Sequence, residues 1–384
     1  MKLSRRGRWA VPAVAVAATG GVIAGSTIAI AQAAPALPAK TPAQLLAYVT
    51  ANQRVPPLTG TVVETTSLGL PQLPQVDSNP TSLSSLLTGS HTVKVYWENA
   101  QHFRLAVPQS LSETDLIRNG NTAWLWESTS NAVTKINLPA DTGKHLNKRA
   151  PVTPAAAPLT PQQAANQVLA AVGKTTTVRT QTNVTVAGEA AYQLVLVPKD
   201  SQSTIGSIQI AIDGKTGVPL RVQVFAKGAT TPAFQVGYTN ISYVAPAAAN
   251  LAFTPPPGAK VTTEGAGSDH AATGSASDES GMGSYGSGWT AVAELPQSDL
   301  LPSGTGGGAP AAQPSSSSGG MLGGGTQEVL NAILGSAKPV SGSWGSGELL
   351  HTSLLNVLIT GGEMYVGAVE PSVLYSAVGH TTAG

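Results

Sequence analysis

The residues that could carry out chemistry are scattered along this chain. Six histidines occur, and no two of them have the spacing of a metal-binding motif; they stand at positions 91, 102, 145, 270, 351 and 380. No serine lies in the Gly-x-Ser-x-Gly turn that exposes a nucleophile in many hydrolases. The chain has no cysteine, which excludes disulfides and thiolate metal ligands. We therefore expect a non-enzymatic protein without a catalytic residue, a metal site or a cofactor.

Two weaker patterns do not change this expectation. Residues 281–286 match the Gly-x-Gly-x-x-Gly motif, but they lie in a Gly/Ser-rich stretch with no strand before them, so a dinucleotide site is not predicted. Glu113 and Asp115 could form a carboxylate pair of the kind that glycosidases use. We expect these two residues in a loop, and the pair alone is a nonspecific signal.

Apolar and aromatic side chains form the better candidate site. Trp97, Trp124 and Trp126 lie in segments with strand patterning, where they either fill the sheet core or line an apolar ligand cavity. Arg104 is expected on the face opposite Phe103 and Leu105, in solvent rather than at a lipid headgroup. The candidate cavity residues are Trp97, Phe103, Leu105, Trp124, Trp126, Leu194 and Leu196.

The elements that must position these residues are mainly strands. Residues 91–138 alternate apolar and polar side chains with a period of two, and Asn/Gly pairs punctuate them, which predicts consecutive antiparallel strands. Further strands are predicted at 60–66, 183–186, 191–197, 207–212, 220–226 and 234–244. The segment 192–197 is apolar on both faces, so we expect it to be covered on both, by the core on one face and by a helix or a cavity on the other.

Two helices have a clear beginning. Thr41 and Gln44, and again Thr160 and Gln163, have the spacing of a capping box, and a proline follows each threonine. A hairpin is predicted farther along the chain, with strands at 349–359 and 363–369 and a turn at Gly361-Gly362. A third helix is predicted from Pro371 to about residue 378. The two capped helices are candidates to cover the predicted strands, and the third helix belongs to the C-terminal part of the chain.

Composition divides the chain into parts. Residues 1–34 are expected to be a signal peptide or an N-terminal anchor, with basic residues before an apolar run and Ala-Gln-Ala at 31–33. Residues 40–262 form the first domain, 263–287 a Gly/Ser-rich linker, and 288–380 a small C-terminal domain with a Gly/Ser/Pro-rich insertion at 303–325. The segment 1–34 contains 4 of the 21 basic residues, so 17 would remain against 20 acidic ones without it. With acidic residues in this slight excess, we expect no basic patch that could bind nucleic acid.

These pieces resemble the LolA-like superfamily, which includes the lipoprotein carrier LolA, LppX-type lipid-binding proteins and the N-terminal domain of MucB/RseB. The likeness rests on GTVVET, WENAQHFRLAV, LIRNGNTAWLWESTSNAVTKINLP, IQIAIDGKTGVPLRVQVFAKG and AFTPPPGAKV. It implies an α+β fold, an unclosed antiparallel β half-barrel with a helical lid. SGWTAVAELP and MYVGAVEP are similar to the second domain of MucB/RseB, which implies a small α+β C-terminal domain.

The resemblance implies two functions for an extracytoplasmic protein. The first is noncatalytic binding of a lipid or lipoprotein acyl chain in an apolar half-barrel cavity, as a carrier or sensor that contacts the membrane surface. The second is an RseB-like regulator that binds the extracytoplasmic part of a membrane-bound anti-sigma factor in an envelope-stress pathway. The residues themselves do not decide between the two functions.

Overall fold

The structure is a computed structural model that describes residues 37–51, 55–69, 88–138, 160–170, 173–265, 283–296 and 335–381. The expected signal or anchor at 1–34, the insertion at 303–325 and most of the linker at 263–287 lie outside these residues. In the described part of the chain, no helix has both the length and the hydropathy needed to span a membrane.

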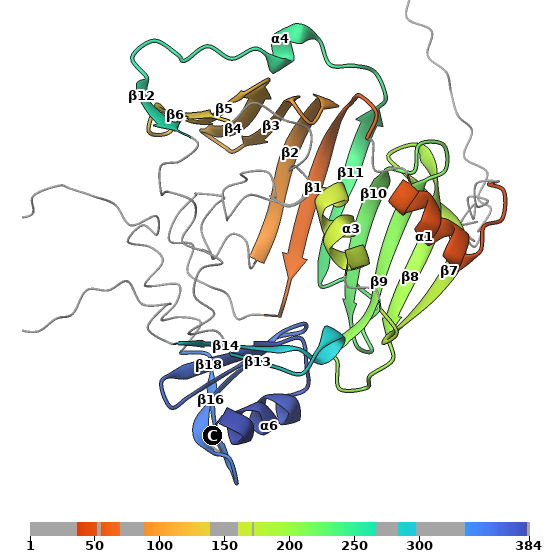
Figure 1. The fold of residues 1–384 in the computed structure, drawn as a ribbon, viewed down its shortest axis with the longest axis vertical. Helices are drawn as coiled ribbons and strands as arrows, with labels where there is room; N and C mark the ends of the chain where they lie inside the picture. The colour runs from red at the N-terminus through yellow and green to blue at the C-terminus, as the bar shows by residue number, and fades with distance from the viewer. Residues whose placement is uncertain are drawn as a thin grey trace, which may run out of the picture. The chain divides into compact units, whose positions relative to one another are not determined.

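A twelve-stranded sheet dominates the described residues (Figure 1), in the order β12-β6-β5-β4-β3-β2-β1-β11-β10-β9-β8-β7. Its neighbours are antiparallel except for β12, which runs parallel to β6. The edge strands β12 and β7 are not paired with each other, so the sheet is unclosed. The strands are β1 (Leu58–Ser67), β2 (Thr88–Asn99), β3 (His102–Pro108), β4 (Glu113–Asn119), β5 (Thr122–Glu127), β6 (Ala132–Asn137), β7 (Thr176–Val186), β8 (Glu189–Pro198), β9 (Ile205–Asp213), β10 (Pro219–Ala226), β11 (Phe234–Ser242) and β12 (Lys260–Gly265).

The helices α1 (Pro42–Ala51) and α3 (Pro161–Ala170) cover the part of the sheet around β7 to β11 (Figure 1). Both begin with the predicted capping box. In α1, Thr41 N donates to Gln44 Oε1 at 2.9 Å and Gln44 N donates to Thr41 Oγ1 at 3.2 Å. The corresponding distances in α3, between Thr160 and Gln163, are 2.9 and 3.3 Å. The expected α+β fold, an unclosed antiparallel sheet with helices on it, is confirmed, with β12 as the parallel exception.

The main core lies between these helices and one face of the sheet, which we call the inner face. Leu45 of α1 and Ala165 of α3 are fully buried there, together with Leu194, Leu196 and Ile210 of the sheet. Burying a leucine or isoleucine side chain stabilises a fold by about 1.5–3 kcal/mol. The helices therefore attach to the sheet mainly through this apolar contact.

The segment 192–197 is covered on both faces, as its sequence predicts. Tyr192, Leu194 and Leu196 belong to the inner core. Val195 points to the opposite, outer face and is only 4% exposed. The outer face therefore also carries apolar contacts under part of β8.

A second sheet of six strands has the order β13-β14-β18-β17-β16-β15. Helix α6 (Pro371–Thr381) packs on it, and Leu374 and Val378 of the helix join Leu358 and Tyr365 in a separate core. The strands are β13 (Gly283–Tyr285), β14 (Val292–Pro296), β15 (Lys338–Gly342), β16 (Gly345–His351), β17 (Asn356–Thr360) and β18 (Glu363–Gly367). The predicted Gly361-Gly362 turn joins β17 and β18, and both glycines have positive φ, 62° and 84°.

Hydrogen bonds connect the loop before β9 to the second sheet. Thr204 Oγ1 donates to Leu354 O at 2.5 Å, and Thr204 N donates to Ala368 O at 3.0 Å. Glu370 N donates to Gln202 O at 2.7 Å. Thr204 is only 6% exposed, so its hydroxyl bond is shielded from water.

Three predicted elements differ from the structure. Glu113 and Asp115 are in strand β4 and not in a loop. Arg104 on the neighbouring strand β3 forms ion pairs with both carboxylates, so β4 can carry acidic residues on one face. β7 begins at Thr176 and not at residue 183, since its exposed polar residues hide the alternation. The apolar run 349–359 is two strands, separated by a turn in which Leu355 N donates to Thr352 Oγ1 at 2.9 Å.

Candidate apolar binding face

An apolar row crosses the inner face of four neighbouring strands. Val95 of β2 is directly opposite Leu105 of β3, Leu105 is opposite Leu116 of β4, and Leu116 is opposite Leu125 of β5. We call these four residues the apolar row. Val95 and Leu116 are buried, while Leu105 and Leu125 are half-buried. The row continues the inner core beyond the strands that α1 and α3 contact.

Two aromatic rings lie beside the apolar row. Trp97 and Phe103 are directly opposed on β2 and β3, and their rings stack with centroids 5.4 Å apart and planes inclined by 22°. Trp97 Nε1 donates to Val55 O at 3.4 Å, which satisfies the polar atom of this ring. The stack therefore presents a rigid apolar surface without an unsatisfied indole N–H.

A basic residue stands on the same face, next to the aromatic stack. Arg118 of β4 is directly opposite Phe103 and, on its other side, opposite Ala123. Its side chain is half-buried, and its Nε donates to Gly120 O at 3.1 Å. The sequence interpretation missed Arg118, although its position two residues after Leu116 on the same strand places both on one face.

The other predicted cavity residues are in two different places. Leu194 and Leu196 are on the inner face but have no exposed surface, because they lie in the core that the helices cover. Trp124 and Trp126 are on the outer face, where they are directly opposite Ile117 and Asp115. The structure thus brings Trp97, Phe103 and Leu105 together and separates them from Trp124 and Trp126.

An aromatic cluster covers the two outer-face tryptophans. The ring of Phe253 lies 5.6 Å from Trp124 and 6.3 Å from Trp126, centroid to centroid. Lys135 Nζ lies 5.3 Å from the centroid of Trp124. Phe253 follows the short helix α4 (Ala248–Leu251), so this segment shields the outer face of β4 and β5.

A buried polar group lies next to this cluster. Arg104 Nη2 donates to Asp115 Oδ2 at 2.5 Å and to Glu113 Oε1 at 3.0 Å. The Arg104 side chain is 23% exposed and that of Asp115 is 0% exposed. The prediction that Arg104 is solvated is therefore wrong, because the two carboxylates of β4 hold it against the sheet.

The charge state of this group depends on pH. Burial raises the pKa of Asp115 from 3.8 to about 6; Arg104 opposes this rise and the neighbouring Glu113 adds to it. Three buried polar atoms here have no hydrogen-bond partner within the described residues: Asp115 Oδ1, Arg104 Nε and Trp126 Nε1. One guanidinium therefore faces two carboxylates in a poorly solvated site.

The described residues contain no group of His, Asp or Glu side chains that could hold a metal ion. The histidines in these residues include His102, whose Nδ1 lies 3.2 Å from Asn99 Oδ1, and His351, whose Nδ1 lies 2.6 Å from Asn356 Oδ1. Both contacts are local and polar. The carboxylate of Glu98 also lies near His102, with Oε2 4.0 Å from Nδ1.

Comparisons with known proteins give structural likenesses alone. No protein-family model matches the chain, and no curated protein matches its sequence. The solved structures similar to it include the MucA/MucB complex of Pseudomonas aeruginosa, with 14% identity, 88% of this chain and 96% of that chain covered, and a TM-score of 0.40. They also include a LolA superfamily protein from Nitrosomonas europaea, with 10% identity, 53% and 94% covered, and a TM-score of 0.18.

A putative outer membrane lipoprotein-sorting protein domain from Vibrio parahaemolyticus is a further similar structure, with 8% identity, 52% and 90% covered, and a TM-score of 0.19. These are the groups of proteins that the sequence resembles.

Proposed function

We propose that this chain is a noncatalytic extracytoplasmic protein that binds a lipid or lipoprotein acyl chain on the inner face of β2 to β5. The observation that carries the proposal is the apolar row with the Trp97–Phe103 stack beside it. This surface continues the main core past the helices and holds half-buried leucines, Leu105 and Leu125, where a core would hold fully buried ones.

The energetics suit a carrier. Each buried CH₂ group contributes about 0.8 kcal/mol, so a chain of about 16 carbons gains on the order of 12 kcal/mol before the costs of binding. A bilayer offers a similar gain. A protein that exchanges such a chain with a membrane therefore needs an apolar surface that is open enough to release it.

Arg118 gives this face a second element of recognition. It is half-buried beside Phe103 and forms no ion pair within the described residues. A guanidinium binds phosphate and carboxylate oxygens well, often through two parallel hydrogen bonds. We therefore assign it the headgroup end of the ligand, a role that the sequence interpretation considered for Arg104.

The proposal is tested with a fluorescent fatty acid and with native mass spectrometry of the gently purified full chain. Leu105→Asn should weaken uptake by about 10- to 100-fold, because about 1.4–2.8 kcal/mol of apolar contact is lost. The matched control is Leu111→Asn, since Leu111 is 98% exposed. Absence of bound lipid together with absence of uptake would contradict the proposal.

A second candidate function is regulation, in which the chain binds the extracytoplasmic part of a membrane-bound anti-sigma factor. The observation in its favour is the second sheet with its own core, joined to the first by the bonds of Thr204. The test is chemical cross-linking of the full chain in envelope membranes, followed by mass spectrometry. A membrane regulator cross-linked to β13–β18 would support it, and cross-links to lipid alone would count against it.

A further inference from the structure

A strap of chain leads from β11 to β12 over the outer face of the first sheet (Figure 1). We define the strap as residues 244–259, which include α4, and this helix packs against β3 and β4. Its apolar anchors are Leu251, which is 6% exposed, and Phe253, whose ring contacts Trp124 and Trp126. The strap therefore covers the outer face of β3 to β5.

Side chains, and not backbone bonds, hold the strap to the sheet. Asn250 N donates to Ala247 O at 2.9 Å, within the strap. Ala252 N donates to Ala248 O at 3.0 Å, again within the strap. Among the described residues, no backbone hydrogen bond joins the strap to a strand. Segments with few bonds to their surroundings open locally before the whole fold unfolds.

Asp115 lies under the strap, beside its aromatic contact. Ala106, Asp115 and Ile117 are on the outer face of β3 and β4 and are 2%, 0% and 0% exposed. Asp115 is directly opposite Trp126, and opposed residues have Cβ atoms about 4.5–5.5 Å apart. The carboxylate is therefore next to the ring that Phe253 contacts.

The charges around Asp115 do not balance when it is ionised. Arg104 of β3 contacts both Asp115 and Glu113 of β4. The strap has no titratable side chain, β5 places none on this face, and Lys135 of β6 lies over Trp124. With Asp115 protonated, one guanidinium faces one carboxylate. Ionised Asp115 adds a buried charge without a cation of its own, which is costly.

Hydrogen bonding also disfavours ionised Asp115 under a closed strap. Its Oδ2 accepts from Arg104, but its Oδ1 has no partner within the described residues. An ionised carboxylate has about four acceptor sites, so it needs further donors. Water can supply them only if the strap moves away, because Asp115 has no exposed surface. Burial accordingly raises the pKa of Asp115 to about 6.

We propose that the strap is a pH-sensitive cover, closed while Asp115 is protonated and open when Asp115 is ionised. Opening exposes the rings of Trp124, Trp126 and Phe253 as an aromatic surface. In the open state water solvates the carboxylate, so its pKa falls toward the ordinary value of 3.8, and rising pH favours the state with fewer bound protons. The strap is on the face opposite the apolar row and does not depend on acyl-chain binding.

The test is the fluorescence of a bimane label on the strap of the full chain. The chain has no cysteine, so Thr254→Cys provides a single attachment point that is exposed and adjacent to Phe253. Tryptophan quenches bimane on contact, so Trp124 and Trp126 should quench the label while the strap is closed. The ratio of open to closed strap should rise about tenfold from about pH 5 to about pH 7.5.

Two variants of the labelled chain connect the opening to Asp115. Asp115→Asn should remove the change with pH, because an amide does not ionise. Glu113→Gln is an independent variant at a side chain that is 32% exposed, so it is compatible with folding. Glu113 raises the pKa of Asp115 and shares Arg104 with it, so Glu113→Gln should move the midpoint of opening to lower pH.

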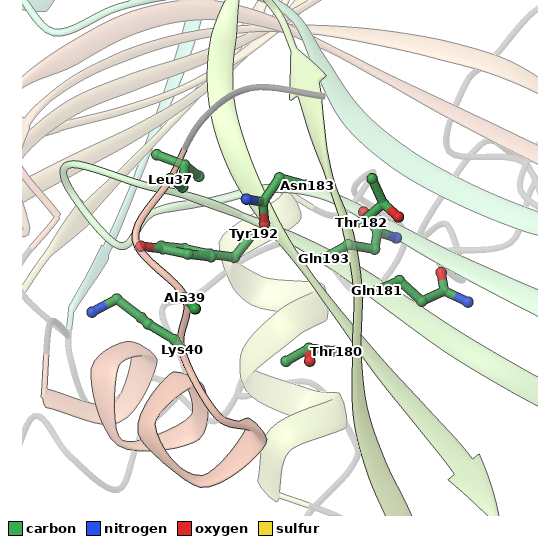
Figure 2. A pocket seen from close by; sticks show the side chains of 9 residues that line it. All are labelled: Leu37, Ala39, Lys40, Thr180, Gln181, Thr182, Asn183, Tyr192 and Gln193. Atoms are coloured by element: carbon green, nitrogen blue, oxygen red, sulfur yellow. The ribbon is translucent and has the colours of Figure 1, made fainter. Parts of the chain in front are cut away.

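Two controls define the signal. Phe253→Ala removes the ring that anchors the strap, so its label should be bright at both pH values. A label at Thr182→Cys should not respond to pH, because Thr182 is exposed and lines a cavity at β7 whose lining contains no tryptophan (Figure 2). Far-ultraviolet circular dichroism should stay constant, which separates local opening from unfolding.

Four outcomes would overturn the proposal. The first is a label that stays quenched at about pH 7.5 while that of Phe253→Ala is bright. The second is an equal rise with and without Asp115→Asn. The third is a label in Phe253→Ala that is quenched as strongly as in the unmodified strap, and the fourth is a loss of circular dichroism over the same pH range.

Discussion

Asp115 is a carboxylate without exposed surface, and it shows how one residue can make stability depend on pH. Burial raises its pKa to about 6, against an ordinary value of 3.8. Between these values the folded chain holds a proton that the unfolded chain has released. The contribution of Asp115 to stability is therefore full below about pH 3.8 and is lost as the pH rises through about 6.

Asp115→Asn should remove this pH dependence. The free energy of unfolding of the unmodified chain should fall relative to that of the variant between about pH 4 and pH 6.5, by on the order of 2 kcal/mol, because each pKa unit corresponds to about 1.4 kcal/mol. Urea unfolding curves at several pH values measure it. Parallel pH profiles for the two proteins would contradict the raised pKa.

At the scale of elements, the two capping boxes begin the helices that close the inner core. Thr160 and Gln163 satisfy each other's backbone N–H groups, as Thr41 and Gln44 do. These bonds are local, which is why four residues of sequence were enough to predict them. The face that each helix buries depends on its contacts with β7, β10 and β11, which no local pattern contains.

Thr160→Ala should lower the free energy of unfolding by about 1 kcal/mol, the typical value of a helix cap. This corresponds to a decrease of about 2–4 °C in the melting temperature of a domain of this size. Thermal melts by circular dichroism provide the measurement. Thr182→Ala is the control, because Thr182 is exposed on β7. An equal loss in both variants would show that the cap is not the cause.

Strand prediction succeeded where one face of a strand is buried. β2, β3 and β8 to β11 follow their alternation because their inner residues join the core or pack against it. β7 was predicted too short, since residues 179–182 are all exposed and give no alternation. No strand is predicted from the sequence at β12, whose residues 263–265 fall in the expected linker, because its parallel pairing with β6 joins residues more than 120 positions apart.

At the scale of the molecule, Thr204 connects two sheets that have separate cores. Its buried hydroxyl donates to Leu354 O, and its backbone N–H donates to Ala368 O. Leu354 also belongs to a small apolar cluster with Leu68 and Ala233. The second sheet is therefore attached through a few buried bonds and contacts and not through a shared main core.

Thr204→Val should weaken this attachment by about 1–3 kcal/mol, because Leu354 O loses its buried donor. Hydrogen exchange followed by mass spectrometry should show faster exchange in β16 to β18 and unchanged exchange in β8 to β10. Thr239→Val is the control, since the Thr239 hydroxyl donates to Thr61 O at an exposed position. Equal acceleration in both regions would mean that the two sheets unfold as one unit.

By itself, the sequence determined the features that depend on neighbouring residues: the alternation of the strands, the capping boxes, and the Gly361-Gly362 turn. It correctly assigned Arg104 and Phe103 to opposite faces of the same strand, because successive residues of a strand point to opposite faces. Only the tertiary structure decided what covers each face. It put Trp97 beside the apolar row, Trp124 and Trp126 under Phe253, and Arg104 against Asp115. The physical reason is that the burial of a side chain depends on segments distant from it in the sequence. The alternation of apolar and polar residues along one strand does not identify those segments.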